Sequence, residues 1–337
     1  MAVATANIGK VMGVSAANIG KIDGVTYSHG GGLTPVYGYC LGGSTGAGSG
    51  AYSVTCDRIT FATEVVAAST ISNISSAKYY VTGLSDKATY GYISGGYTGA
   101  AVLTTDRIVF ATSVTSAATV SNLLATKWAH ASVSDGVTYG YVCAGVSSAT
   151  AEKITFSTGV YAASTISNAS EARYNLRGLS DAVTYGYFMG GQPSVVTDRI
   201  VFSTSVTSAS TISNLSVAVH APLTISDNTT NGYICGGNTG GENTGITTVN
   251  RIVFSTSTTS ANTVSVLSLA RWSGGTTTIG STNGYIMGGS TGTTAASFVP
   301  TVVTDRMVFA TGVISAYTTS NLSIAKCNQG SCTDYAI

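Results

Sequence analysis

The side chains able to carry acid–base or metal chemistry are few in this sequence, and most of them recur at fixed places. Among 337 residues there are 15 Lys or Arg, 14 Asp or Glu and three His. A polar pair opens the same strand-like phrase six times, in DRITF (57–61), DRIVF (106–110), EKITF (152–156), DRIVF (198–202), NRIVF (250–254) and DRMVF (305–309). An active site needs unlike groups that converge once. A pair repeated in every unit therefore predicts a structural role, such as joining neighbouring units.

Two further charged positions also recur. An Asp that follows Ser or Thr is expected to accept hydrogen bonds from its own turn, and it is found as Asp86, Asp135, Asp181, Asp227 and Asp334. A basic residue ends another segment of the repeat, as Lys78, Lys127, Arg173, Arg271 and Lys326. The charges left over are scattered over different repeats: Lys10, Lys21, Asp23, Glu64, Lys87, Glu171, Arg177 and Glu242. Together with His29, His130 and His220 they form no constellation, so we predict no catalytic residue, no metal site, no cofactor and no enzymatic activity.

Composition narrows the classes of partner. The net charge of +1 offers no basic surplus for a phosphate backbone, which argues against a nucleic-acid partner. No run of 18 apolar residues occurs, so we expect no membrane insertion. The start, MAVATANIGK, lacks a basic region followed by an apolar one, and we expect no signal peptide. The cysteines show no CxxC spacing and are predicted to be reduced, partly buried thiols: Cys40, Cys56, Cys143, Cys235, Cys327 and Cys332.

The elements that carry these positions form six repeats. Each repeat begins with a seven-residue phrase, in which Tyr or Asn is followed by Gly-Tyr and the last residues are Gly-Gly or Ala-Gly. The six copies are YGYCLGG (37–43), YGYISGG (90–96), YGYVCAG (139–145), YGYFMGG (185–191), NGYICGG (231–237) and NGYIMGG (283–289). After each come the DRIVF-like strand, an outer segment such as STISNLS (210–216) and a run such as LRGLSD (176–181). Abundant Thr, Val and Ile and the turn residues predict four strands per repeat. Such a unit cannot bury both faces alone, so we predict an all-β, six-bladed β-propeller with four-stranded blades.

The ends of the sequence predict how this ring closes. The run that precedes the Gly-Tyr phrase in the other copies is missing before YGYCLGG. At the C-terminus, KCNQGSCTD (326–334) aligns without gaps on RYNLRGLSD (173–181). We therefore predict that the C-terminal strand completes the first blade.

The order of apolar strand, Gly-Gly, variable loop, strand with an aromatic and polar strand near a basic residue resembles the kelch repeat, over about residues 30–337. The sequence departs from that family because Thr or Ser replaces the tryptophan of the outer strand. Copper oxidases built on kelch propellers need two histidines and two tyrosines around a metal, and sialidase propellers carry an Asp-box. Neither pattern is present, which again predicts a protein that is not an enzyme.

Two features vary between repeats, and function is expected where the scaffold varies. The loops after Gly-Gly are longest in blades five (238–249), six (290–304) and one (44–56), with candidate ligand-binding residues Tyr52, Asn238, Asn243 and Phe298. The residue after the recurrent basic position is the second feature: Tyr79, Trp128, Tyr174, His220 and Trp272, with Cys327 in the closing copy. Both sets are expected on one face around the channel mouth. The rings are candidates for stacking on sugars, and packing between blades is the alternative.

Residues 1–26 form a region apart from the propeller of residues 27–337. They contain ANIGKVMGV (6–14) and ANIGKIDGV (17–25), a tandem motif that resembles segments of phage virion proteins, particularly tail fibres and related appendages. The resemblance implies a docking tail for other virion proteins, and an unstructured leader is the alternative. The candidate docking residues are Asn7, Ile8, Lys10, Val11, Asn18, Ile19, Lys21 and Ile22.

These interpretations lead to one principal hypothesis. It is a phage structural and host-recognition protein, made in the host cytoplasm without a signal peptide and located in the virion. The tail would dock on the particle, and the propeller would bind a host-surface glycan or protein. A bacterial kelch-type interaction scaffold or surface adhesin is the alternative, and a carbohydrate-active enzyme is a remote one.

Overall fold

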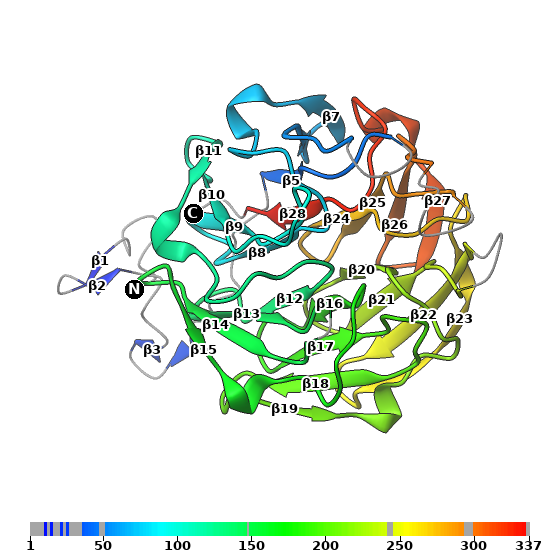
Figure 1. Ribbon diagram of the computed structural model, residues 1–337. Coiled ribbons are helices and arrows are strands. Elements are labelled where there is room, and N and C mark those ends of the chain that lie inside the picture. Colours follow the sequence, from blue (N-terminus) through cyan, green and yellow to red (C-terminus); the bar gives the residue numbers. More distant parts are fainter. Residues whose placement is uncertain are drawn as a thin grey trace, which may run out of the picture.

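The computed structural model is a six-bladed β-propeller, in which six four-stranded antiparallel sheets surround a central channel (Figure 1). It describes residues 36–46, 51–146, 148–240, 245–292 and 299–334, and four short strands within residues 10–26. From the inner to the outer strand, the blades are β28 (Gly330–Thr333), β5 (Tyr37–Leu41), β6 (Cys56–Thr60) and β7 (Val65–Ala68) for blade 1; β8 (Thr82–Ser85), β9 (Tyr90–Ser94), β10 (Thr105–Val109) and β11 (Val114–Ala117) for blade 2; β12 (Ala131–Ser134), β13 (Tyr139–Cys143), β14 (Ala151–Thr155) and β15 (Val160–Ala163) for blade 3; β16 (Arg177–Ser180), β17 (Tyr185–Met189), β18 (Thr197–Val201) and β19 (Val206–Ala209) for blade 4; β20 (Leu223–Ser226), β21 (Asn231–Cys235), β22 (Thr248–Val253) and β23 (Thr258–Val266) for blade 5; β24 (Gly275–Ile279), β25 (Asn283–Met287), β26 (Thr304–Val308) and β27 (Val313–Ala316) for blade 6.

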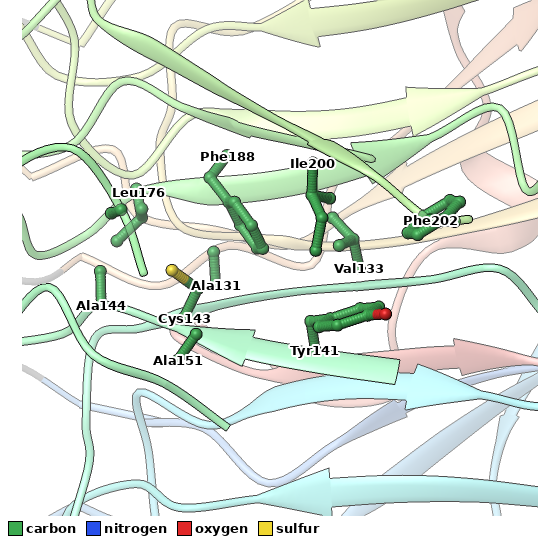
Figure 2. Packing of buried hydrophobic residues seen from close by; sticks show 11 residues of the cluster. Ala131, Val133, Tyr141, Cys143, Ala144, Ala151, Leu176, Phe188, Ile200 and Phe202 are labelled. Atoms are coloured by element: carbon green, nitrogen blue, oxygen red, sulfur yellow. The ribbon is translucent and has the colours of Figure 1, made fainter. Parts of the chain in front are cut away.

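The Gly-Tyr strand of each blade is buried on both faces, because it lies between two neighbouring blades. In β17, Phe188 points toward blade 3 and belongs to one buried cluster with Ala131 and Cys143, as Figure 2 shows. The alternate residues Tyr187 and Met189 pack instead with side chains of blade 5. Burying each large side chain contributes about 1.5–3 kcal/mol, so these strands supply much of the stability of the ring.

The glycine within that strand is required by the close approach of the blades. A Cβ on Gly186 would lie 2.7 Å from Val133 Cγ2 of blade 3 and 2.9 Å from Ile200 Cγ2 of its own blade. Real Cβ atoms do not approach so closely, so any larger residue here would push two blades apart.

The C-terminal strand closes the ring, as the sequence predicted. Strand β28 pairs with β5, with Gly330 opposite Leu41 and Thr333 opposite Gly38. Asp334 Oδ1 accepts hydrogen bonds from the backbone N–H of Val36 at 3.0 Å and Tyr37 at 2.6 Å. The two ends of the described propeller are therefore joined by both a strand pair and a turn.

The predicted position of the outer strand was wrong. In blade 4 the outer strand is β19 (Val206–Ala209), and the segment 210–216 begins with a 3-10 turn, η6 (Thr211–Ser213). Side-chain bonds to the backbone favour this turn over an extended strand. Ser213 Oγ donates to the carbonyl O of Ser257 in the next blade at 2.6 Å, and Asn214 Oδ1 accepts the N–H of Thr197 at 3.0 Å.

Blade 5 shows what happens without that Asn. The equivalent turns of the other blades are η3 (Thr70–Ser72), η4 (Thr119–Ser121), η5 (Thr165–Ser167) and η7 (Thr318–Ser320). Each is followed by an Asn whose Oδ1 accepts a backbone N–H: Asn73, Asn122, Asn168 and Asn321. In blade 5 Val266 stands at this place and pairs with Thr248 through the backbone. The outer strand β23 is consequently extended to nine residues.

The acidic member of the repeated pair joins neighbouring blades, as expected. Asp106 Oδ2 lies 2.9 Å from Lys78 Nζ, and its Oδ1 accepts the N–H of Ser75. Lys78 and Ser75 both belong to the connection that leaves blade 1. The basic member has a different task, since the Arg58 guanidinium lies over the Tyr37 ring, 4.3 Å from its centroid.

Each copy of the N-terminal motif forms a small hairpin. Strand β1 (Lys10–Val11) pairs with β2 (Val14–Ser15), and β3 (Lys21–Ile22) pairs with β4 (Val25–Thr26). The hairpins form sheets of their own rather than adding to a blade, and Figure 1 shows β1, β2 and β3 outside the ring. The candidate docking residues Asn7, Ile8, Asn18 and Ile19 lie outside the described residues. Within the described part of the chain, no helix is long and apolar enough to cross a membrane.

Candidate functional site

One face of the propeller is organised by a closed circle of backbone hydrogen bonds, which we call the girdle. It consists of six residues, one per blade, that follow the recurrent aromatic position: Tyr80, Ala129, Asn175, Ala221, Ser273 and Asn328. Each donates its N–H to the carbonyl O of its counterpart in the preceding blade, at distances from 2.5 to 3.3 Å. Tyr80 bonds to Asn328, which completes the circle.

All girdle residues have left-handed backbone conformations, although none is glycine. Their φ angles run from 48° at Ala221 to 62° at Ser273. A non-glycine residue in this region costs about 1–2 kcal/mol, so the conformation persists only where its surroundings determine it. Here the six hydrogen bonds between blades and the packing of the neighbouring aromatic side chains hold the backbone in this conformation. Because none of these positions is a glycine, the sequence did not indicate a left-handed backbone, and the girdle was not predicted.

The predicted aromatic positions and the variable loops lie together on this face. Isolated β-bridges join Tyr79 to Tyr97, His220 to Asn238 and Trp272 to Ser290, and in each pair the second residue belongs to the loop after Gly-Gly. The two features that vary between repeats are therefore adjacent in every one of these blades.

The rings on this face form one packed group that includes Tyr174 and Trp272. Five of its members come from blades 1 to 3 and are here called the aromatic cluster: Tyr52, Tyr79, Tyr80, Tyr97 and Trp128. Tyr52 stacks on Tyr79 with centroids 4.9 Å apart and an interplanar angle of 12°. The ring centroid of Trp128 lies 5.2 Å from those of both Tyr80 and Tyr97.

Exposure separates the members of this cluster. Tyr79 and Tyr80 are buried, whereas Tyr52, Tyr97 and Trp128 keep part of their surface accessible. Tyr174, also partly accessible, packs against the cluster from blade 4. Burial raises the pKa of the Tyr79 hydroxyl to about 12, so this side chain is neutral near pH 7. The accessible part of the cluster therefore consists of the rings of Tyr52, Tyr97 and Trp128. Tyr80 and Tyr97 were not predicted as candidate ligand-binding residues. Their positions could have indicated it, because Tyr80 follows the recurrent aromatic position and Tyr97 follows the Gly-Gly of its repeat.

The opposite part of the face is packed. Trp272 is fully buried, its Nε1–H donates to the carbonyl O of Gly292 at 3.1 Å, and it stacks on His220 with centroids 5.6 Å apart. Burial lowers the pKa of His220, which favours the neutral imidazole. At these two positions the structure favours packing over ligand contact.

The loop residues proposed as ligand contacts have different outcomes. Asn238 is buried, and its Oδ1 accepts the N–H of Gly240 at 2.7 Å, so it shapes its own loop. Asn243 and Phe298 lie outside the described residues.

Beneath the girdle the central channel forms a cavity of about 190 Å³. The inner strands line it mainly with Ser, Thr and Gly, and two cationic side chains, Arg177 and Lys87, also face it. No carboxylate is among the described residues that line it. Most wall hydroxyls are used between blades, as where Ser132 Oγ donates to the carbonyl O of Gly83 at 2.8 Å.

The six cysteines are buried free thiols, which confirms the prediction from their spacing. Burial raises the pKa of Cys143 and of Cys327 to about 12, so neither is a reactive thiolate near neutral pH. Among the described residues, no group of three or more His, Cys, Asp or Glu side chains is placed to hold a metal ion.

Comparison with known proteins assigns the chain to no family. No protein-family model matches the sequence, and no curated protein matches it. The kelch and phage resemblances therefore stay sequence-based predictions, and the fold and the girdle face carry the functional argument.

Proposed function

We propose that this protein is a non-enzymatic virion component whose propeller binds a glycan on the host surface through the aromatic cluster. The β-propeller fold is compatible with a protein-interaction or binding role, and the proposal adds the ligand class and the biological setting. The observation that carries it is the group of partly accessible rings of Tyr52, Tyr97 and Trp128, which lies beside the variable loops on the girdle face. Aromatic rings with polar neighbours present large, rigid contact surfaces at a low cost in conformational entropy.

The kelch-like repeat and the tandem N-terminal motif support the wider setting. In this proposal residues 1–26 attach the protein to other virion proteins, and the two hairpins present the same motif twice. Lys10 and Lys21 occupy equivalent positions in β1 and β3, as Val11 and Ile22 do. Two similar contacts on one chain raise the affinity for a repeated partner through effective concentration.

A glycan array with the full chain tests the ligand. Wild-type protein is expected to bind a subset of glycans, and Trp128→Ala and Tyr97→Ala are expected to reduce that binding about tenfold or more, because each removes part of the stacking surface. Tyr139→Ala is a matched control, since Tyr139 is also partly buried but lies under Lys153, 4.4 Å away, outside the cluster. Unchanged binding by both cluster variants, with folded protein in each case, would refute the role of this face.

The attachment role has a separate test. Phage particles assembled with a chain that lacks residues 1–26 are expected to lose this protein, while the separate propeller keeps its glycan binding. Normal incorporation of the shortened chain would contradict the docking role. Binding to a protein receptor but to no glycan would favour the interaction-scaffold alternative.

A further inference from the structure

Arg177 is a partly buried cation that lines the central cavity and lies outside the paired positions of the repeat. At the recurrent basic position each Lys or Arg pairs with the acid of the following blade: Lys78–Asp106, Lys127–Glu152, Arg173–Asp198, Arg271–Asp305 and Lys326–Asp57. Arg177 is one of the charges that lie outside the repeat, and no ion pair to it is found among the described residues. Partial burial weakens the hydration of a cation, so an oxyanion bound beside Arg177 would supply the counter-charge that the cavity wall lacks.

The contacts of Arg177 leave donors for such an anion. Its Nη2 donates to Ser273 Oγ of the girdle at 3.0 Å, and its Nη1 donates to the carbonyl O of Leu176 at 3.2 Å. A guanidinium has five N–H donors in a planar fork that suits oxyanions. Arg177 begins the inner strand β16 and lines the cavity just below the girdle. Burial lowers its pKa to about 10, which still leaves it charged near neutral pH.

Lys87 supplies a second positive charge to the same cavity. Its Nζ donates to Asn228 Oδ1 at 3.1 Å, so the side chain reaches from blade 2 to the turn of blade 5. The glycine of blade 3 leaves room for it, because a Cβ on Gly136 would lie 2.8 Å from Lys87 Cδ. Arg177 therefore lies toward the girdle, and Lys87 lies toward the Asp turns.

Lys87 is also attracted by acids outside the cavity. Burial lowers the pKa of Lys87 to about 8, and Asp181 and Asp135, in the turns of blades 4 and 3, oppose that shift and favour its charged form. Their carboxylates cap backbone N–H groups of their own turns, and neither lines the cavity. The wall itself stays cationic and hydroxylic.

We propose that the channel binds a small oxyanion, a carboxylate or a phosphate, with Arg177 as its principal ligand and Lys87 as the second positive charge. Nothing in the repeat requires either side chain, since the equivalent positions of the other blades hold no second Arg or Lys that lines the cavity. In this proposal the anion enters from the face of the Asp turns, opposite the girdle. This site is separate from the aromatic cluster, and its occupancy is independent of glycan binding.

Calorimetric titration of the full chain with sodium phosphate and with sodium acetate, each in a background matched in ionic strength with sodium chloride, tests this site. At least one of the two anions is expected to bind saturably. Tighter binding of phosphate would indicate a phosphate ligand, and tighter binding of acetate would indicate a carboxylate ligand. Arg177→Gln is expected to weaken binding about tenfold or more, because it removes a charge-assisted fork. Lys87→Met should weaken it less. Arg251→Gln, which removes an exposed Arg of blade 5, is the matched control and should bind like the wild type.

Two results would overturn the site. One is the absence of saturable binding of either anion to the wild type beyond the effect of chloride. The other is equal binding by wild type and Arg177→Gln. If Arg177→Gln does not fold, Arg177→Lys keeps a charge without the fork and is expected to bind several-fold more weakly than wild type. Equal affinity in that variant would likewise contradict the assignment.

Discussion

The two ends of the channel are built on opposite principles. At one end, the carboxylates of Asp86, Asp135, Asp181 and Asp227 bind N–H groups of the strand that directly follows, as Asp135 Oδ1 accepts from Val137, Thr138 and Tyr139 at 2.7 to 2.9 Å. Asp334 binds the N–H groups of Val36 and Tyr37 in the same blade. At the other end, the girdle bonds join each blade to the next and none is local. Damage to an Asp turn should therefore stay within one blade, whereas damage to the girdle should spread round the ring. Four predictions test that contrast.

The largest effect is expected from deleting residues 327–337, because the deletion damages both ends. It removes β28, the girdle residue Asn328 and the turn residue Asp334. The remaining chain would expose the apolar face of β5 and is expected to aggregate. Light scattering and calorimetry would measure this. A soluble monomer with one cooperative transition near that of the wild type would contradict the account.

Ala221→Pro breaks the girdle at one point. Proline lacks the N–H that Ala221 donates to Asn175 at 2.5 Å, and its fixed negative φ is incompatible with 48°. The free energy of unfolding is expected to fall by about 3 kcal/mol or more, measured by chemical denaturation.

Ala221→Gly is the control for that variant. Glycine keeps the N–H and adopts positive φ without strain, so stability should stay near the wild-type value or rise by up to about 1 kcal/mol. Equal losses in the two variants would show that side-chain packing, rather than the hydrogen-bonded circle, matters at this position.

His130, which follows the girdle residue Ala129, is expected to make the stability of the girdle end of the channel depend on pH. Burial lowers the pKa of His130 to about 3, and its Nε2 lies 3.2 Å from the carbonyl O of Ser94. The unfolded chain takes up a proton near pH 6.5 while the folded chain does not, so this stability is present above pH 6.5 and is lost as the pH falls toward 3. Relative to His130→Gln, the wild type is expected to lose about 2 kcal/mol between pH 7 and 4.5. Parallel stability curves for the two proteins would rule this out.

The smallest effect is expected from Asp135→Ala at the other end. Loss of the hydrogen bonds to three backbone N–H groups should cost about 1–2 kcal/mol, and Asp135→Asn, which keeps Oδ1, should cost less. Hydrogen exchange should show reduced protection only near residues 137–139. Reduced protection around the whole ring would contradict the local character of the Asp turns.

The same contrast explains what sequence could predict. Asp turns, the Gly-Tyr strands and the closing strand depend on residues close in sequence or on an exact repeat, and all of them were foreseen. The outer strand was misplaced, because the choice between strand and 3-10 turn depends on Ser213 and Asn214 finding acceptors and donors elsewhere. The girdle depends wholly on contacts between blades, and Ala129 or Ala221 carries no local sign of a left-handed backbone.

The candidate site was predictable in part. Its location beside the variable loops followed from the order of strands. Its asymmetry did not, because the burial of Trp272 and the accessibility of Trp128 depend on which rings and loops lie above each blade. Arg177 and Lys87 were visible as charges outside the repeat, but only the fold shows that they share a cavity.

The turn formed by Asp334 and Val36 also sets a polarity for anything attached to this ring. Because that turn belongs to the end of the channel opposite the girdle, the chain enters and leaves the propeller on the face away from the aromatic cluster. A partner that holds the protein by the segment before Val36 would thus leave the rings of Tyr97 and Trp128 pointing outward. It also makes the ring a candidate for circular permutation, with the old ends joined beside Asp334 and new ends opened in any other Asp turn, which would move the tether from blade to blade while the outward face stayed the same.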